Sequence, residues 1–159
     1  MKRFLMIAMA ALAVLVLASC DFFGFGDSPE LQVIVRANPG ETPADMAPEL
    51  EIDFGKPVAG EHVDVVFTVK NVGTADLILE ADGPHFVEIV DQHHAEEPFM
   101  VLIGADTNTI SAGQEVEVTI RFTGQSTSTR YTAKLLIPSN DKEHPNYFLN
   151  LVGDGEGFS

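Results

Sequence analysis

The sequence contains little or none of three things that would help to identify its fold and function: cysteine, tryptophan and positive charge. Its 159 residues contain one cysteine, Cys20, and no tryptophan. A single cysteine excludes an internal disulfide, and without a cysteine pair and a tryptophan the hallmarks of antibody domains are also missing. The core of any folded domain must therefore rest on Val, Leu, Ile and Phe.

Basic residues are scarce, with nine Lys and Arg against 24 Asp and Glu and a formal net charge of −15. Two of these bases, Lys2 and Arg3, lie at the amino terminus, so the chain from residue 20 onward has seven bases, 24 acids and a net charge of −17. Such a surface repels phosphate backbones and anionic headgroups. We therefore expect no nucleic-acid partner.

Long apolar runs are also few, and the one that stands out covers residues 4–18, directly after Lys2 and Arg3. A basic start, a short apolar middle and small residues at the end are typical of a secretory signal. As a helix the run would span about 22 Å at 1.5 Å per residue, which is short of the ~30 Å hydrocarbon core. We therefore expect a signal peptide over residues 1–19 rather than a transmembrane helix.

The run ends in Leu17-Ala18-Ser19-Cys20, which resembles the lipoprotein box of bacteria. The resemblance implies cleavage before Cys20 and acylation of this residue by fatty acids such as palmitate. Stable attachment needs more than one acyl chain, because a single chain binds only marginally. Cys20 would then tie the protein to the membrane of the cell envelope, outside the cytoplasm. Asp21 resembles an inner-membrane retention signal, but inner and outer membrane both stay open, as does an ordinary signal with an incidental cysteine.

Residues 20–47 have the composition of a flexible tether, with Gly24, Gly26 and Pro29 among phenylalanines and a second group of breakers at residues 38–43. Between these two groups, residues 31–36 are β-prone. We expect this short segment to form an edge strand.

From residue 48 onward, apolar and polar residues alternate in short segments separated by turn residues. Val116, Val118, Ile120 and Phe122 share one face of the clearest segment, as is typical of a half-buried strand. No helical period is found outside the signal. We expect seven or eight strands, at residues 49–54, 62–70, 75–80, 86–90, 99–103, 115–123, 131–137 and 147–152. This number of short strands predicts an all-β sandwich over residues 48–157.

Five short motifs follow one another within this range: Phe54-Gly55, residues 67–77, residues 110–122, residues 133–141 and residues 149–155. In this order they resemble the motifs of Hydin-type immunoglobulin-like modules, also called ASH or choice-of-anchor D domains. The resemblance implies an immunoglobulin-like β-sandwich and a role in binding or scaffolding. One departure is Thr123-Gly124, which stands where the family often has proline.

The turns of this module carry residues with expected structural roles. Gly73 and Gly113 are expected to take positive φ, which glycine adopts without a Cβ clash. Asn71 and the pair Asn140-Asp141 are expected to hydrogen-bond their own turns.

The densest group of possible metal ligands is His93, His94, Glu96 and Glu97, with Asp91 nearby. Imidazoles and carboxylates suit zinc, nickel or copper. Adjacent histidines on an extended strand point to opposite faces, and the other three histidines are scattered. We interpret the group as a solvated loop, with metal binding as the alternative, and expect no cofactor.

Catalytic signatures are sparse as well. There is no Gly-x-Ser-x-Gly elbow or phosphate-binding glycine loop, and Ser126, Thr127 and Ser128 form a polar loop without an evident base. The sequence therefore predicts an envelope-anchored lipoprotein that acts as a non-enzymatic protein-binding or structural module. Such a module would contact a protein partner through its loops or by strand addition at a free sheet edge. An envelope hydrolase is a further alternative.

Overall fold

The computed structural model describes residues 26–36 and 44–157, and this part of the chain is built of eleven strands without a helix. Accordingly, no described helix is long and apolar enough to cross a membrane. The strands are β1 (Leu31–Arg36), β2 (Ala44–Met46), β3 (Glu51–Asp53), β4 (His62–Asn71), β5 (Leu77–Ile78), β6 (Glu88–Val90), β7 (Phe99–Ile103), β8 (Thr109–Ile110), β9 (Glu115–Thr123), β10 (Arg130–Pro138) and β11 (Asn146–Asp154).

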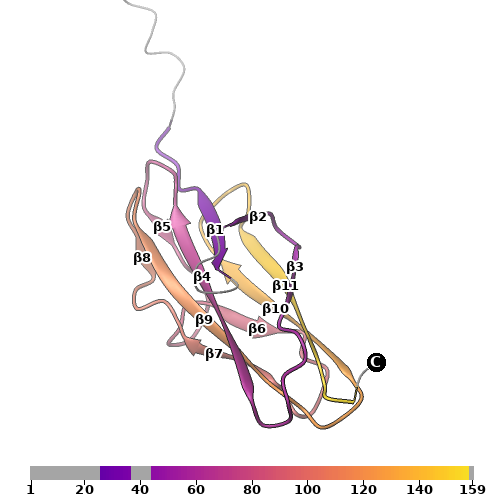
Figure 1. The fold of residues 1–159 in the computed structure, drawn as a ribbon. Coiled ribbons are helices and arrows are strands. Elements are labelled where there is room, and N and C mark those ends of the chain that lie inside the picture. Colours follow the sequence, from indigo (N-terminus) through magenta and orange to yellow (C-terminus); the bar gives the residue numbers. More distant parts are fainter. Residues whose placement is uncertain (1–25, 37–43, 158–159) are drawn as a thin grey trace, which may run out of the picture.

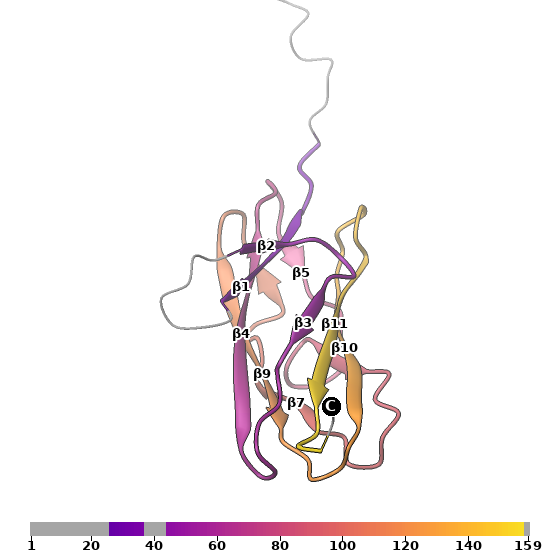
Figure 2. The ribbon, with the colours of Figure 1, turned by 45° about the vertical axis from the view of Figure 1, so that its right-hand side comes forward.

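The strands form two facing layers, as the sequence predicts for an immunoglobulin-like β-sandwich (Figure 1). One layer has the order β2-β1-β4-β9-β7, the other has the order β3-β11-β10-β6, and β5 pairs with β8. Figure 2 separates the two layers, with β4 and β9 on one side and β3, β11 and β10 on the other. Every pairing is antiparallel except the parallel contact between β3 and β11.

The core lies between the two layers and consists of the side chains that alternation predicts. Phe67, Val118, Ile120 and Leu135 are all fully buried, as expected. Each such side chain contributes about 1.5–3 kcal/mol on burial, so a domain of this size needs no disulfide. A cluster of rings fills one part of the core, with centroid distances of 4.7–6.2 Å between neighbours: Phe54, Phe99, Phe122 and Tyr131.

The expectation that residues 31–36 form an edge strand is wrong, because β1 lies between β2 and β4. Leu31, Val33 and Val35 alternate and are buried in the core, which draws the strand into the sheet. The range predicted as a tether, 20–47, therefore contains two strands of the sandwich. The alternation over residues 49–54 predicts Leu50 on the same face as Ile52 and Phe54, but Leu50 is 45% exposed whereas the other two are buried.

The turn residues follow the expectations in part. Gly113 has a φ of 77°, as predicted, but Gly73 does not adopt positive φ. Gly73 is required for another reason, because a Cβ there would lie 2.2 Å from the carbonyl oxygen of Ser28. Gly124, in the turn that departs from the family pattern, is similarly crowded, with a Cβ position 2.3 Å from the carbonyl oxygen of Val58.

Candidate functional site

The predicted lipidation site, Cys20, and the predicted signal peptide, residues 1–19, lie outside the described residues. The structure does describe where the following segment joins the domain. This junction and the edge of the larger sheet that β7 forms are the two features that bear on function.

The junction begins at Ser28, whose backbone is bonded to the turn that follows β4. The carbonyl oxygen of Ser28 accepts hydrogen bonds from the amides of Thr74 (2.9 Å) and Ala75 (3.2 Å). The amide of Ser28 donates to the hydroxyl of Thr74, and the amide of Val72 donates to the carbonyl of Glu30. The chain is thus held to the sandwich three residues before β1 begins.

Asn71 is fully buried beneath this junction and connects several segments. Its side-chain amide donates to the carbonyls of Ala75 (2.7 Å) and Ile110 (2.8 Å). Its side-chain oxygen accepts from the amides of Gly73 (3.0 Å) and Glu30 (3.4 Å). The bonds to Gly73 and Ala75 lie within the turn of Asn71, as predicted, and the bonds to Ile110 and Glu30 fix that turn to β8 and to the incoming chain.

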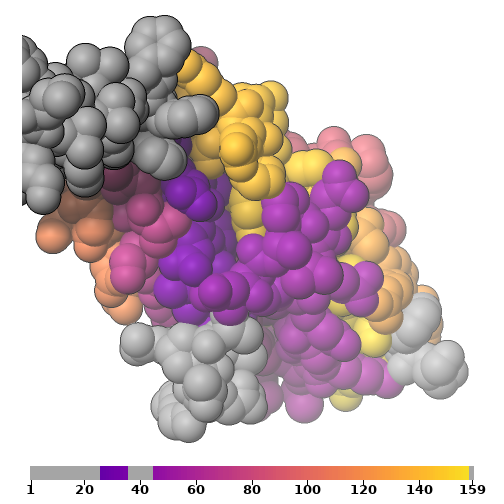
Figure 3. All heavy atoms as spheres, turned by 90° about the horizontal axis from the view of Figure 1, so that it is seen from above, coloured from indigo at the N-terminus to yellow at the C-terminus, as the bar shows by residue number. Residues whose placement is uncertain are grey.

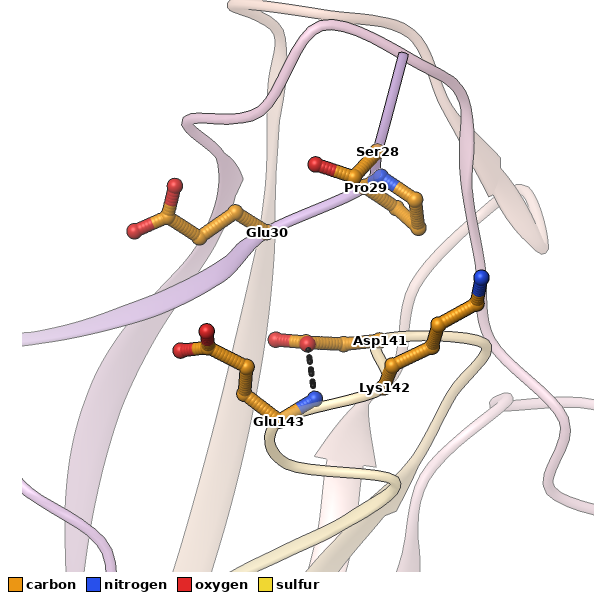
Figure 4. A pocket seen from close by; sticks show the side chains of 6 residues that line it. All are labelled: Ser28, Pro29, Glu30, Asp141, Lys142 and Glu143. Atoms are coloured by element: carbon orange, nitrogen blue, oxygen red, sulfur yellow. Dashed lines mark hydrogen bonds between the residues drawn. The ribbon is translucent and has the colours of Figure 1, made fainter. Parts of the chain in front are cut away.

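Asp141 secures the start of β1 from the opposite layer. Its carboxylate is buried and accepts hydrogen bonds from the amides of Leu31 (3.0 Å), Glu143 (2.8 Å) and His144 (3.4 Å). Figure 4 shows Asp141 and Glu143 facing Glu30 across a small opening. Since the carboxylate of Asp141 is already bonded to three amides, its role is to stabilise the fold.

The junction therefore fixes the point at which the chain enters the sandwich. Figure 1 shows the entry at the end that carries the start of β1, whereas β11 finishes at the opposite end. Figure 3 looks down on the entry end, where the indigo of the first described residues borders the gold of the connection between β10 and β11.

The candidate metal ligands are not gathered into one site. The ring of His94 packs edge-on against Tyr131, with centroids 4.8 Å apart, while His93 is exposed. Asp91 forms an ion pair with Lys134 (2.7 Å), whose hydrogen bond and charge lower the pKa of the Asp91 carboxyl. Within the described residues, no group of three or more His, Cys, Asp or Glu side chains is placed to hold a metal ion.

The polar loop at residues 126–128 holds the end of the chain in place. The hydroxyl of Thr127 is hydrogen-bonded to that of Tyr131, and the hydroxyl of Ser128 donates to the carbonyl of Gly157 (2.6 Å). A nucleophilic hydroxyl needs an adjacent base. In the described part of the chain, neither hydroxyl is bonded to a histidine or a carboxylate.

The larger sheet ends at β7, and this edge is the feature that sequence reasoning missed. The segment 99–103 was predicted as a strand, but alternation cannot reveal which strand lies at an edge. Met100 is 49% exposed and Ile103 57% exposed. The side-chain amide of Gln92 donates to the carbonyl of Phe99 (3.0 Å), and its oxygen accepts from the amide of Phe99 (3.0 Å).

The other end of this edge is covered as well. The amide of Ala105 donates to the carbonyl of His85 (3.1 Å), and a Cβ at Gly104 would lie 2.3 Å from the Cβ of His85. Between these two contacts, no hydrogen bond from the described residues reaches the outer edge of β7, and β6 of the smaller sheet approaches β7 without pairing with it.

Two facing layers of strands, antiparallel except for β3 beside β11, define an immunoglobulin-like β-sandwich. The chain matches the family described as the HYDIN/CFA65/VesB-like, Ig-like domain over residues 48–154, which is more than half of its length. It belongs to this family, as the sequence motifs indicated. Members of such folds are typically structural or binding modules rather than catalysts. β1 and β2 precede the matched range.

Solved structures of similar fold come from distant sources. A protein of unknown function from Porphyromonas gingivalis W83 has a TM-score of 0.50 and 13% identity, covering 82% of this chain and 67% of that one. The secreted serine protease VesC from Vibrio cholerae has a TM-score of 0.50 and 16% identity, covering 69% of this chain but 22% of VesC.

The ASH/PapD-like domain of human CEP192 has a TM-score of 0.48 and 15% identity, covering 77% of this chain and 84% of that one. No curated protein matches the chain. At these identities the similarity concerns the fold alone.

Proposed function

We propose that this chain is a lipoprotein of the bacterial cell envelope whose immunoglobulin-like domain binds a protein partner close to the membrane. The observation that carries the proposal is the junction at Ser28, whose carbonyl is bonded to Thr74 and Ala75. Only eight residue steps separate Ser28 from Cys20. Even fully extended, eight residues reach about 26–29 Å at 3.3–3.6 Å each.

This reach is much shorter than that of the tether expected over residues 20–47. A lipid on Cys20 would hold the domain within about one domain length of the membrane surface. It would also present the end around Ser28 and Asp141 to that surface, because the chain leaves the sandwich there. The strongly negative net charge would keep the domain off anionic headgroups.

The binding role is supported by the family and by what the site contains. In the described part of the chain, the hydroxyls of Thr127 and Ser128 are bonded to neither a histidine nor a carboxylate, and no three potential ligands are placed to hold a metal ion. The open edge of β7 offers a surface on which a partner could be bound. No contact in the described chain favours the metal-binding or the hydrolase alternative over this role.

The anchor is tested by growing cells with an alkyne analogue of palmitate and comparing the full chain with its Cys20→Ser variant. We expect label in the wild type, the mass of a chain that begins at residue 20, and no label in the variant. Label that persists in Cys20→Ser, or its absence from the wild type, would contradict the anchor.

The binding role is tested by chemical crosslinking in intact cells, followed by mass spectrometry of the captured proteins. We expect the wild type to yield the same crosslinked envelope protein in repeated experiments, at sites on the sandwich. Without any such protein, the binding role would be refuted.

A further inference from the structure

We propose that the open edge of β7 accepts a short extended segment of a partner protein, apolar at its centre and carrying Lys or Arg on both sides. This proposal rests on the proposed binding function and specifies where and what the module binds. The ligand would add a strand to the five-stranded sheet, next to β7.

The backbone of β7 is oriented for such an addition. Gln92 bonds both polar groups of Phe99, so these groups point away from β9. In an antiparallel strand every second residue directs its amide and carbonyl to the same side. Val101, which pairs with Ile120 of β9, therefore also turns its polar groups to the open edge. No described loop or side chain is bonded to them.

The ends of the edge limit the length of the added strand. The side chain of Gln92 bonds the backbone groups of Phe99 that an added strand would use, and the carbonyl of His85 likewise bonds the amide of Ala105. A register shift between Val101 and Ile103 bends the strand between these two contacts. Covered ends and bulges prevent long flat strands from pairing at an edge, which leaves room for a short segment only.

The side chains beside this opening are apolar. Met100 is 49% exposed and Ile103 57% exposed, and no other described strand carries two exposed large apolar side chains. Apolar side chains of an added strand would cover part of this surface, which contributes about 25 cal/mol for each Å² buried. The partner segment should therefore be apolar at its centre.

Acidic side chains lie beyond both ends of the opening. Glu96 and Glu97 precede β7 and are exposed. At the other end, a recess beside Ile103 is lined by Asp106, Glu115 and Glu117.

The one cation of the neighbouring strand β9 is already paired, and Lys70 of β4 lies opposite Glu115. Arg121, opposite Met100, donates two hydrogen bonds of 2.7 Å to Asp64, so it does not offset the acids at the two ends. Opposite charges steer and orient a ligand, so basic residues are expected on both sides of its apolar centre.

The same charges disfavour a second copy of this chain as the occupant. Two β7 edges paired antiparallel about a two-fold axis would bring Glu96 and Glu97 of one copy toward Asp106 of the other. Each copy also carries a net charge of −15. Like charges placed together oppose association, so the partner is a different and basic chain.

The experiment uses the full chain in mild detergent and the acetylated, amidated peptide Lys-Lys-Val-Thr-Val-Thr-Val-Lys-Lys. We expect saturable binding by fluorescence anisotropy, and slower amide exchange at Val101 because its amide gains an acceptor. The double variant Met100→Glu, Ile103→Glu should bind at least about tenfold more weakly. Leu50→Glu is the matched control, since Leu50 is 45% exposed and lies before β3 at the opposite edge. It should stay within about twofold of the wild type.

A second peptide with Glu in place of each Lys should bind at least about tenfold more weakly than the first. Equal binding of the two peptides, equal binding by the double variant, or unchanged exchange at Val101 would each overturn the proposal. So would a dimer of the chain that dissociates on Met100→Glu, Ile103→Glu substitution.

Failure of this proposal can be distinguished from failure of the proposed function. Failure of fatty-acid labelling would remove the anchor and leave the β7 site standing. Crosslinks to a partner from another face would instead retain the binding module and remove this edge as its site.

Discussion

Replacing Asn71 with alanine should destabilise the sandwich by about 2–4 kcal/mol. The substitution deletes a fully buried carboxamide that makes four hydrogen bonds. The carbonyl of Ile110, itself in a buried residue, would lose its donor, which costs about 1–3 kcal/mol. The groups of Ala75, Gly73 and Glu30 are only part-buried, so water can replace their three bonds, which together add about 1 kcal/mol.

The assay is urea unfolding followed by far-ultraviolet circular dichroism, because the chain lacks tryptophan. Asn140→Ala is the matched control, since its side chain bonds the amide of Ile78 (2.8 Å) and the carbonyl of Asp76 (3.2 Å) in an exposed setting. The control should lose no more than about 1 kcal/mol. The reasoning is refuted if Asn71→Ala loses no more stability than Asn140→Ala.

Three further predictions concern pH and packing. Hydrogen bonds from Arg121 lower the pKa of Asp64, so folding stability should fall as the pH drops below about 4. Urea midpoints of Arg121→Gln should show a shallower fall. Burial raises the pKa of Tyr147 to about 12, so the folded state should lose stability from about pH 10 upward. Absorbance titration should find a tyrosine with a midpoint near 12 that Tyr147→Phe lacks; a midpoint near 10 would contradict this. Gly153→Ala would place a Cβ 2.6–2.8 Å from the ring of Phe122 and should cost about 1–3 kcal/mol in urea unfolding; unchanged stability would contradict the crowding.

Alternation of apolar and polar residues was enough to predict most of the sandwich. The strands at residues 62–70, 99–103 and 115–123 correspond to β4, β7 and β9, because period-two patterns report one buried face directly. The two-residue strand β8 and the three-residue strand β2 are too short to show such a period. Leu50 follows the alternating pattern but lies before β3, because a pattern does not show at which residue a strand begins.

The junction and the edge depend on contacts between distant residues. Asp141 and Leu31 are 110 positions apart, and nothing local to either predicts their hydrogen bond. The position of β7 at the edge of the sheet follows from the strand order, which the alternation of apolar and polar residues does not reveal. Gln92 likewise reads as an ordinary loop residue until its contact with Phe99 is seen.

The account is tested most directly by placing a photo-crosslinking amino acid at position 103 or at position 50 of the full chain in intact cells. Both side chains are exposed, and they lie on opposite sides of the sandwich. We expect a protein to be crosslinked through position 103 and not through position 50. The crosslinked part of that protein should be a basic extended segment, and the crosslink should be lost on Cys20→Ser substitution. Equal crosslinking from both positions, or none from position 103, would contradict it.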